Sequence, residues 1–311
     1  MKLAHVGYVL SKSEFAAEKG GDASFLFSVL QDPVNIGLIL VTAVVVFTGY
    51  YFFRRNETCR TFMVGLRKHE VDYRSLFPWI ARLALGIAFI GAGAEQFLLT
   101  PAFASTPFLG FVQMAVGFLL LSGFMLFPAL LLVGALFLIA LLHDPYYIGN
   151  LDYLALIIVT LIWGSSRPGV DHLLGVSLPR EWKKYSEYTN LILRLGVGVS
   201  MIYLAVFEKI LHPHAMELVV SQYDLTSVVP VSLAMWVVAT GVIEICIGAA
   251  LLLGFKTRLV AAVALLVLTL SFFFFGEEVY SHVTLFGVLS ILFIAGSGRV
   301  SIDEELGSEI C

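Results

Sequence analysis

Residues 190–211 have the sequence NLILRLGVGVSMIYLAVFEKIL, a run of 22 residues in which only Arg194, Glu208 and Lys209 are charged. About 20 predominantly apolar residues in an α-helix are enough to cross roughly 30 Å of hydrocarbon. Similar runs recur along the chain, which is 59% hydrophobic and only 14% charged. A soluble domain has about 45–50% apolar residues and about 25% charged residues. The sequence therefore predicts an all-α, polytopic membrane protein.

The apolar runs divide into nine predicted transmembrane helices. Their ranges are 34–53, 78–99, 108–126, 128–143, 150–164, 190–211, 230–254, 258–275 and 281–296. Proline stands at the start of four of them, where its missing N–H breaks no helical hydrogen bond. Residues 1–32 contain no apolar run that would form the core of a signal peptide, so we expect them to remain as an extracytoplasmic tail.

Lys and Arg residues gather in alternate connections between the predicted helices. The thirteen residues concerned are Arg54, Arg55, Arg60, Arg67, Lys68, Arg74, Arg167, Arg180, Lys183, Lys184, Lys256, Arg258 and Arg299. Because short loops rich in Lys and Arg stay in the cytoplasm, these positions predict a cell-membrane protein with its N-terminus outside and its C-terminus in the cytoplasm. The net charge of -4, without a basic stripe, argues against a nucleic-acid partner and leaves membrane lipid as the expected surroundings.

Spans two to five and spans six to nine have similar sequences, which indicates an internal repeat. The matched segments are 82–86 with 194–198 at an offset of 112, 112–117 with 243–248 at an offset of 131, and 164–171 with 296–303 at an offset of 132. Four spans per copy is an even number, so we expect two parallel four-helix bundles related by a pseudo-two-fold axis along the membrane normal. The increase in offset places an insertion of 19 residues around 214–229, on the outer side of the second copy.

Three segments carry a resemblance to a known family: RLGVGVSMIYLAVFEKIL (194–211), EICIGAALLLGFKTR (244–258) and GSGRVSID (296–303). In order and spacing they resemble the DoxX family of small four-span membrane proteins, with residues 80–171 as a degraded copy. The expected organisation is an N-tail (1–32), an extra span with a basic loop (33–77), a first DoxX-like repeat (78–171), a linker (172–189), a second repeat (190–303) and a C-tail (304–311). The resemblance implies association with quinol oxidase and thiosulfate:quinone oxidoreductase complexes, although related families also include cargo receptors.

Ionisable residues within the spans need a partner or a role, because each costs about 2.5–3.5 kcal/mol to insert at the helix centre. Arg194 and Glu244 lie at depths that two long side chains can bridge, so we expect a buried ion pair between them. Such a pair is either a structural clamp between two helices or a site that handles a ligand or protons. The equivalent residues of the first copy, Arg82 and Gln113, cannot form an ion pair, and we expect them to be structural.

A second group of polar residues marks the outer ends of the spans. Glu208 and His212 share one helix face, with Lys209 and His214 nearby, and His282 begins the ninth span. Imidazole and carboxylate groups suit proton exchange with a quinol oxygen, or a transition metal. We expect no metal site, with these three histidines as its weak candidates, and the alternative is a set of interfacial histidines without a ligand.

The sequence has no motif for an intrinsic catalytic cofactor. Walker, nucleophile-elbow and dinucleotide-binding patterns are absent, and Cys59, Cys246 and Cys311 form no CxxC pair. The chain is therefore at most an accessory subunit of an oxidoreductase. The resemblance favours an integral membrane subunit of a redox or quinone-linked complex, with quinone as the one expected cofactor and a soluble or membrane oxidoreductase as partner.

Two other functions remain open from the sequence. One is a non-catalytic membrane scaffold or chaperone-like receptor, which a closed outer face would favour. The other is a transporter of small molecules or ions that uses the repeat interface, which a polar path joining Glu95, Arg194 and Glu244 would favour. A quinone-sized cleft beside Glu208 and His282 would favour the redox subunit.

Overall fold

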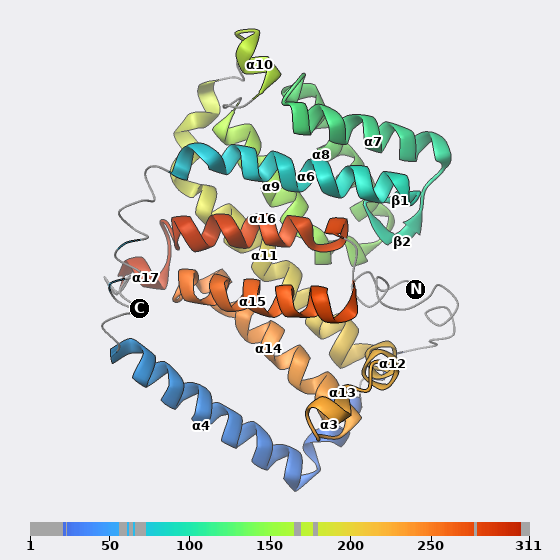
Figure 1. The fold of residues 1–311 in the computed structure, drawn as a ribbon, viewed down its shortest axis with the longest axis vertical. Coiled ribbons are helices and arrows are strands. Elements are labelled where there is room, and N and C mark those ends of the chain that lie inside the picture. The colour runs from blue at the N-terminus through green and yellow to red at the C-terminus, as the bar shows by residue number, and fades with distance from the viewer. Residues whose placement is uncertain are drawn as a thin grey trace.

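The computed structural model describes residues 21–22, 24–55, 61, 65, 73–164, 169–176, 180–276 and 279–305. Within these residues the protein is almost entirely helical (Figure 1). The α-helices are α3 (Phe25–Leu30), α4 (Pro33–Arg55), α6 (Phe77–Ala94), α7 (Pro107–Ser122), α8 (Leu126–His143), α9 (Leu151–Trp163), α10 (Val170–Leu173), α11 (Thr189–Leu204), α12 (His214–Gln222), α13 (Leu225–Val228), α14 (Leu233–Leu253), α15 (Thr257–Phe275), α16 (Val279–Ala295) and α17 (Ile302–Glu305). The other elements are the 3₁₀ helices η1 (Arg74–Leu76), η2 (Pro145–Asn150) and η3 (Arg180–Tyr188), the π-helix η4 (Ala205–Leu211), and the strands β1 (Phe97–Leu98) and β2 (Thr100–Ala104).

Each predicted span coincides with an apolar helix. Six segments of the described chain are long and apolar enough to cross a membrane, namely Arg74–Ala94, Leu126–His143, Pro145–Trp163, Glu181–Leu211, Leu233–Leu253 and Thr257–Phe275. Shorter apolar helices at Pro33–Val44, Pro107–Ser122 and Val279–Ala295 match the three remaining predicted spans. The predicted fold class, an all-α polytopic membrane protein, is confirmed.

The second span is shorter than the sequence predicts. A helix was expected over 78–99, but α6 ends at Ala94, and residues 97–104 form an antiparallel hairpin of β1 and β2. The cause is local, because Glu95 and Gln96 interrupt the apolar run. Gln96 has a φ of 56°, a left-handed conformation in which a helix cannot continue.

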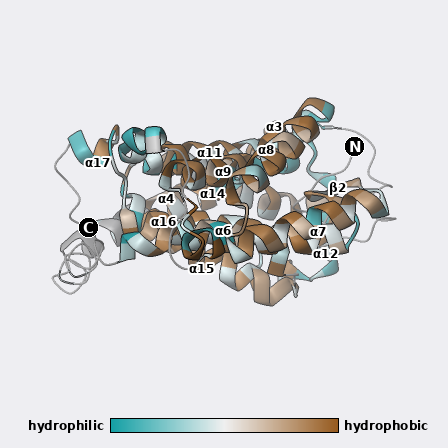
Figure 2. Ribbon diagram, turned by 90° about the horizontal axis from the view of Figure 1, so that it is seen from above, coloured by the Kyte–Doolittle hydropathy of each residue, from teal (hydrophilic) through white to brown (hydrophobic). Residues whose placement is uncertain are grey.

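The outer helices expose large apolar side chains. On α15, for example, Leu266, Leu270 and Phe273 all point away from the protein interior. Figure 2 shows hydrophobic residues along most of the bundle and hydrophilic residues toward its two ends, near α17 and near α3 and β2. Apolar surface of this extent is unfavourable in water and stable against lipid chains, as expected for a multi-pass membrane protein.

The two copies of the repeat pack against each other reciprocally. Helix α9 of the first copy contacts α11 of the second, and α16 of the second contacts α6 of the first. A Cβ atom added to Gly287 would lie 2.7 Å from the Cβ of Ala84, and one added to Gly196 would lie 2.5 Å from the Cβ of Ala155. Ala84 is equivalent to Gly196 in the repeat, and Ala155 is equivalent to Gly287. The interface between the copies therefore has pseudo-two-fold symmetry.

Within each copy, the first two helices approach closely at a pair of glycines. A Cβ atom on Gly117 would lie 2.8 Å from the carbonyl oxygen of Gly86, and one on Gly248 would lie 2.8 Å from the carbonyl oxygen of Gly198. Small residues allow helix backbones to meet in this way within a membrane. These contacts repeat at the offsets that the sequence predicts, whereas the domain boundaries themselves stay a prediction.

Helix α4, which belongs to neither copy, joins the bundle at one end through α3. Phe25 and Val29 of α3 are buried in a cluster with Val237 and Val238 of α14. Asn35 Nδ2 donates a hydrogen bond of 3.0 Å to the carbonyl oxygen of Val29, which fixes the start of α4 on α3. From there α4 diverges from the bundle (Figure 1).

The connections that were predicted to share a side of the membrane share an end of the bundle. Helices α10 and α17 lie at one end, and the β1–β2 hairpin and α12 lie at the other (Figure 1). Four of the basic residues that set the predicted orientation lie outside the described residues: Arg60, Arg67, Lys68 and Arg167. Which end faces the cytoplasm stays a prediction.

Candidate functional site

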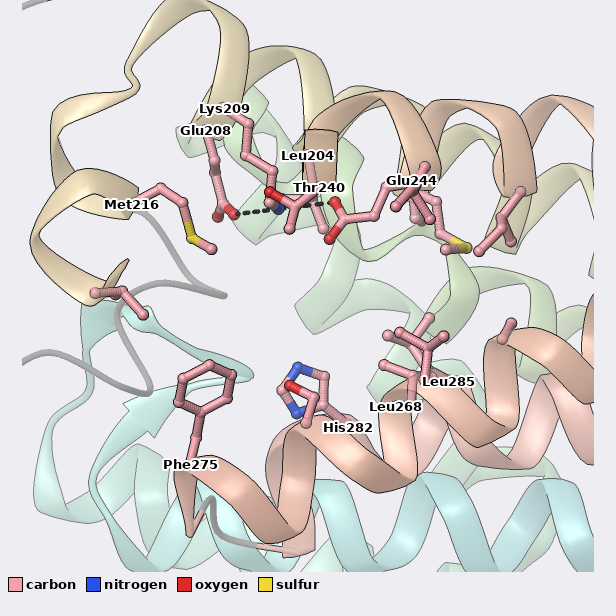
Figure 3. A pocket seen from close by; sticks show the side chains of 18 residues that line it. Leu204, Glu208, Lys209, Met216, Thr240, Glu244, Leu268, Phe275, His282 and Leu285 are labelled. Atoms are coloured by element: carbon pink, nitrogen blue, oxygen red, sulfur yellow. Dashed lines mark hydrogen bonds and ion pairs between the residues drawn. The ribbon is translucent and has the colours of Figure 1, made fainter. Parts of the chain in front are cut away.

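A cavity of about 260 Å³ lies in the second copy, between α11 with η4, α14, α15 and α16, and α12 contributes to its outer end. Its lining is mostly apolar, with Met, Leu, Ile, Val and Phe side chains. The polar residues of the lining are Ser200, Glu208, Lys209, Thr240, Glu244, Ser271 and His282. Figure 3 shows Glu208, Lys209 and Glu244 along one wall, with His282 pointing toward them from the opposite wall.

The π-helix η4 positions two of the charged residues. Helix α11 continues beyond Leu204 as a wider turn, in which consecutive side chains are separated by a smaller angle than in an α-helix. Glu208 and Lys209 are both buried there, and both line the cavity. Gly241 of α14 makes room for this bulge, because a Cβ atom added to it would lie 3.1 Å from the Cβ of Lys209. Single π-helical turns occur frequently at functional sites.

The charged side chains form a connected series. Lys209 Nζ lies 2.7 Å from Glu244 Oε2 and 3.8 Å from Glu208 Oε2. The hydroxyl of Tyr146, from η2 of the first copy, donates a hydrogen bond to Glu208 Oε1. In surroundings of low dielectric constant, this arrangement offsets part of the desolvation of three charges. It leaves the cavity with two carboxylates facing one ammonium group.

His282 stands at the start of α16 and is mostly buried. Its Nδ1 atom is 2.9 Å from Ser281 Oγ. It also interacts electrostatically with Asp152 of the first copy, a fully buried residue whose carboxylate is hydrogen-bonded by Thr284. Asp152 is not among the site residues that the sequence predicts. An acidic residue inside a predicted span was a usable signal, and Thr284 is its equivalent in the second copy.

The structure brings together four of the residues that the sequence singled out, Glu208, Lys209, Glu244 and His282. It does not bring His212 to them. His212 Nδ1 lies 2.9 Å from the carbonyl oxygen of Phe207, and the two rings lie 4.4 Å apart at their centroids. The prediction that His212 converges with Glu208 is wrong, because the π-helix turns the end of this span away from α-helical i, i+4 geometry.

The weak metal candidates are also separated from one another. His214 is on the surface, with Nδ1 2.9 Å from Glu217 Oε2, while His282 lies within the cavity. Among the described residues, no three His, Cys, Asp or Glu side chains are grouped so that they could hold a metal ion.

The predicted ion pair between Arg194 and Glu244 is wrong. Arg194 Nη2 donates to the carbonyl oxygens of Val300, at 2.8 Å, and Arg299, at 3.3 Å, whereas Glu244 pairs with Lys209. The prediction rested on the depth of Arg194 and Glu244 in the membrane, and depth does not indicate which face of its helix a side chain occupies. Lys209 is the cation that pairs with Glu244, and backbone carbonyls at the end of the bundle accept hydrogen bonds from Nη2 of Arg194.

Arg194 belongs to a clamp at the predicted cytoplasmic end of the second copy. Gly254, which has a φ of 64°, lies against its guanidinium group, and a Cβ atom there would be 1.6 Å from Nη1. Asp303 accepts hydrogen bonds from the backbone N–H groups of Lys256, at 2.8 Å, and Thr257, at 3.1 Å. Asp303 also interacts electrostatically with Arg194. This geometry favours a structural role for Arg194.

The first copy repeats this clamp. Arg82 lies against Gly123, where a Cβ atom would be 1.9 Å from its Nη1. Asp171 accepts hydrogen bonds from the N–H groups of Met125, at 2.9 Å, and Leu126, at 2.8 Å. The same contacts therefore recur at the predicted offsets of 112, 131 and 132.

The first copy does not repeat the charged series. Gln96, Phe97 and Gln113 stand where the second copy has Glu208, Lys209 and Glu244. Gln113 is fully buried, and its Nε2 atom donates a hydrogen bond of 3.1 Å to the carbonyl oxygen of Phe97 in the hairpin. Gln113 thus holds β1 against α7, and the two copies share a scaffold but not a site.

These features define a multi-pass α-helical membrane protein built from two related four-helix units, with a charged cavity in the second unit. The DoxX family model matches residues 189–277, which span most of that unit and most of the cavity lining. This segment is therefore a DoxX domain, as its sequence predicts, while the resemblance of residues 80–171 stays a prediction. No curated protein and no solved structure matches the chain.

Proposed function

We propose that the protein is an integral membrane subunit of a redox complex, and that it binds a quinone headgroup in the cavity between Glu208 and His282. The observation that carries this proposal is the combination of hydrogen-bond donors and acceptors inside a mostly apolar cavity at that place. Small-molecule sites are typically apolar with a few convergent polar groups.

The chemistry of the lining suits both redox forms of such a ligand. A quinone accepts hydrogen bonds at its carbonyl oxygens, for which Lys209 and His282 supply donors. A quinol donates from its hydroxyl groups, for which Glu208 and Glu244 supply acceptors. Ser200 adds a buried hydroxyl that, among the described residues, has no hydrogen-bond partner.

Reduction of a quinone takes up electrons and protons. Glu208 and His282 are the residues of this chain suited to exchange protons with the ligand oxygens. We propose that a soluble or membrane oxidoreductase partner carries the electron-transfer cofactors, because this chain has no motif for them. Purification in mild detergent, followed by mass spectrometry and an absorption spectrum, tests whether such a partner is bound. A chain that purifies alone and colourless from its own membranes contradicts this part of the proposal.

The same geometry argues against transport through the repeat interface. Glu95 is exposed at the C-terminal end of α6, and Arg194 is fixed at the opposite end of the bundle by Val300 and Arg299. Neither residue lines the cavity that holds Glu244. Glu95, Arg194 and Glu244 therefore lie in separate parts of the protein and do not line one polar path.

Thermal unfolding in lipid nanodiscs tests the binding of the quinone. A ligand that binds only the folded state at 100 times its Kd stabilises by about 2.7 kcal/mol. We expect decylubiquinone or menadione to raise the melting temperature of the wild type but not that of Glu208→Gln or His282→Ala. His212→Ala is the matched control and should respond as the wild type does. A wild type that no quinone stabilises, or a Glu208→Gln variant with an unchanged response, contradicts the proposal.

A further inference from the structure

The most exposed part of the cavity lining belongs to α14 and α15. Of the 18 lining residues, eight are buried, among them Ser200, Glu208 and Leu285, and eight are half-buried. The two most exposed lining residues are Ile243, at 49%, and Val267, at 46%. Each of these side chains lines the cavity on one side and is exposed at the protein surface on the other. We therefore place the mouth of the cavity, the point where it approaches the surface, at Ile243 and Val267.

This mouth faces the hydrocarbon and not water. Ile243 lies halfway along α14, and Val267 lies halfway along α15. The middle of a membrane-spanning helix is at the centre of the bilayer, about 15 Å from either surface of a hydrocarbon layer of about 30 Å. The two helices diverge from their shared turn at Gly254 toward the other end of the bundle (Figure 1), and residues of both line the cavity at this depth.

Glu244 stands at the same mouth. Its side chain is 34% exposed, although it lies beside Ile243 in the middle of α14. A carboxylate at this depth is costly against lipid chains, even when it is paired with Lys209. A bound molecule at the mouth would shield this carboxylate from the lipid chains.

The size of the cavity restricts what can fill it. A volume of about 260 Å³ is slightly below the range of about 300–1,000 Å³ that is typical of small-molecule sites. It has room for one substituted ring and not for a long isoprenoid or alkyl chain as well. A ligand with such a chain must leave the chain outside the cavity.

From the exposed lining, its depth and the volume, we infer that the ligand is a long-chain quinone dissolved in the bilayer, which enters sideways between α14 and α15. Its ring lies in the cavity, and its chain passes between Ile243 and Val267 into the lipid. This inference rests on the proposed quinone site and adds the route and the ligand class, a membrane-dissolved amphiphile instead of a water-soluble quinone.

The test uses the full chain in nanodiscs and two probes that share one headgroup. Decylubiquinone has a ten-carbon chain, whereas ubiquinone-0 has none. Val267→Trp, which narrows the mouth, is expected to weaken equilibrium binding of decylubiquinone by at least about tenfold and to change that of ubiquinone-0 by less than about threefold. Ile243→Trp narrows the mouth from the other helix and should have the same effect. Empty nanodiscs correct for partition of each quinone into lipid.

The control is Leu266→Trp, because Leu266 is exposed on α15 next to Val267 and is not part of the lining. It should bind both probes as the wild type does. If the variants at the mouth lose both probes equally, or lose neither, the chain does not pass between α14 and α15 and the inference is wrong. A wild type that binds neither probe contradicts the proposed function itself, and the inference with it.

Discussion

The hydroxyl of Tyr146 donates a hydrogen bond to Glu208, so a residue of the first four-helix unit completes the polar wall of a cavity in the second. Tyr146 is buried in η2, and its ring packs edge-on against Phe207 with centroids 5.5 Å apart. Both contacts hold the π-helix in place from outside its own unit. The site therefore depends on how the two units are docked.

Removal of this hydroxyl should weaken the site. Hydrogen bonds to charged groups contribute about 1.5–3 kcal/mol, and Tyr146→Phe takes one such donor from Glu208. We expect a lower melting temperature in detergent together with a weaker affinity for decylubiquinone. Tyr147→Phe is the control, because Tyr147 donates to the backbone carbonyl of Leu98, at 2.6 Å, and not to the cavity. It should lower stability by about 0.5–1.5 kcal/mol and leave quinone affinity unchanged. Equal losses of affinity in both variants would show that Tyr146 acts only through general packing.

Lys209 and Glu244 should be energetically coupled. Removal of one partner of a buried ion pair typically costs about 3–5 kcal/mol, whereas replacement of both is much milder. Lys209→Met and Glu244→Gln should therefore each lower the melting temperature more than the double variant does. The loss for Lys209→Met should be the larger, because it also leaves Glu208 without its nearest cation. Additive losses would mean that the contact of 2.7 Å does not persist in the membrane.

Arg194 provides the control for this cycle. Arg194→Leu combined with Glu244→Gln should give additive losses of stability, because the two side chains have separate partners. Non-additive losses would show that Arg194 and Glu244 interact, as the sequence alone suggests.

Gly254→Ala should destabilise the protein for two reasons that can be separated. An alanine at a φ of 64° costs about 1–3 kcal/mol of backbone strain, and its Cβ would overlap the guanidinium group of Arg194. Gly276→Ala isolates the first effect, because Gly276 also has a φ of 64° and, within the described part of the chain, no other group lies within 4 Å of the added atom. The melting temperature of Gly254→Ala should be clearly the lower of the two. Equal melting temperatures would show that Arg194 moves aside without loss.

The orientation can be measured with single cysteines at Ser105, beside the hairpin, and Ser186, in η3. Cys59, Cys246 and Cys311 are first replaced so that no native thiol reacts. The predicted orientation places position 105 outside, so Ser105→Cys should react with a membrane-impermeant maleimide in intact cells. Ser186→Cys should react only after permeabilisation. The opposite pattern would invert the topology and place η4 toward the cytoplasmic side.

Hydropathy and repetition were sufficient to predict the apolar helices of the bundle, although not the early end of α6 at Ala94. The reason is that lipid requires long apolar runs and a duplicated fold repeats its small residues. The partners of the polar residues were harder to predict. Whether Glu244 meets Arg194 or Lys209 depends on rotation about the helix axis, and the π-helix changes that rotation locally. Tyr146 carries no sequence signal at all, since it reaches Glu208 through the packing of one unit on the other.

The reciprocal contacts of Ala84 with Gly287 and of Ala155 with Gly196 have a further consequence. A surface that packs against its own equivalent is what a homodimer of a four-helix protein needs. The chain is thus organised as a dimer whose two subunits share one backbone. In a true homodimer every substitution would appear in both subunits at once. When the two halves belong to one chain, each half can change independently of the other. The second half can therefore keep its ion-pairing residues, while the first half has other residues at those positions and supplies Tyr146 across the interface between the halves.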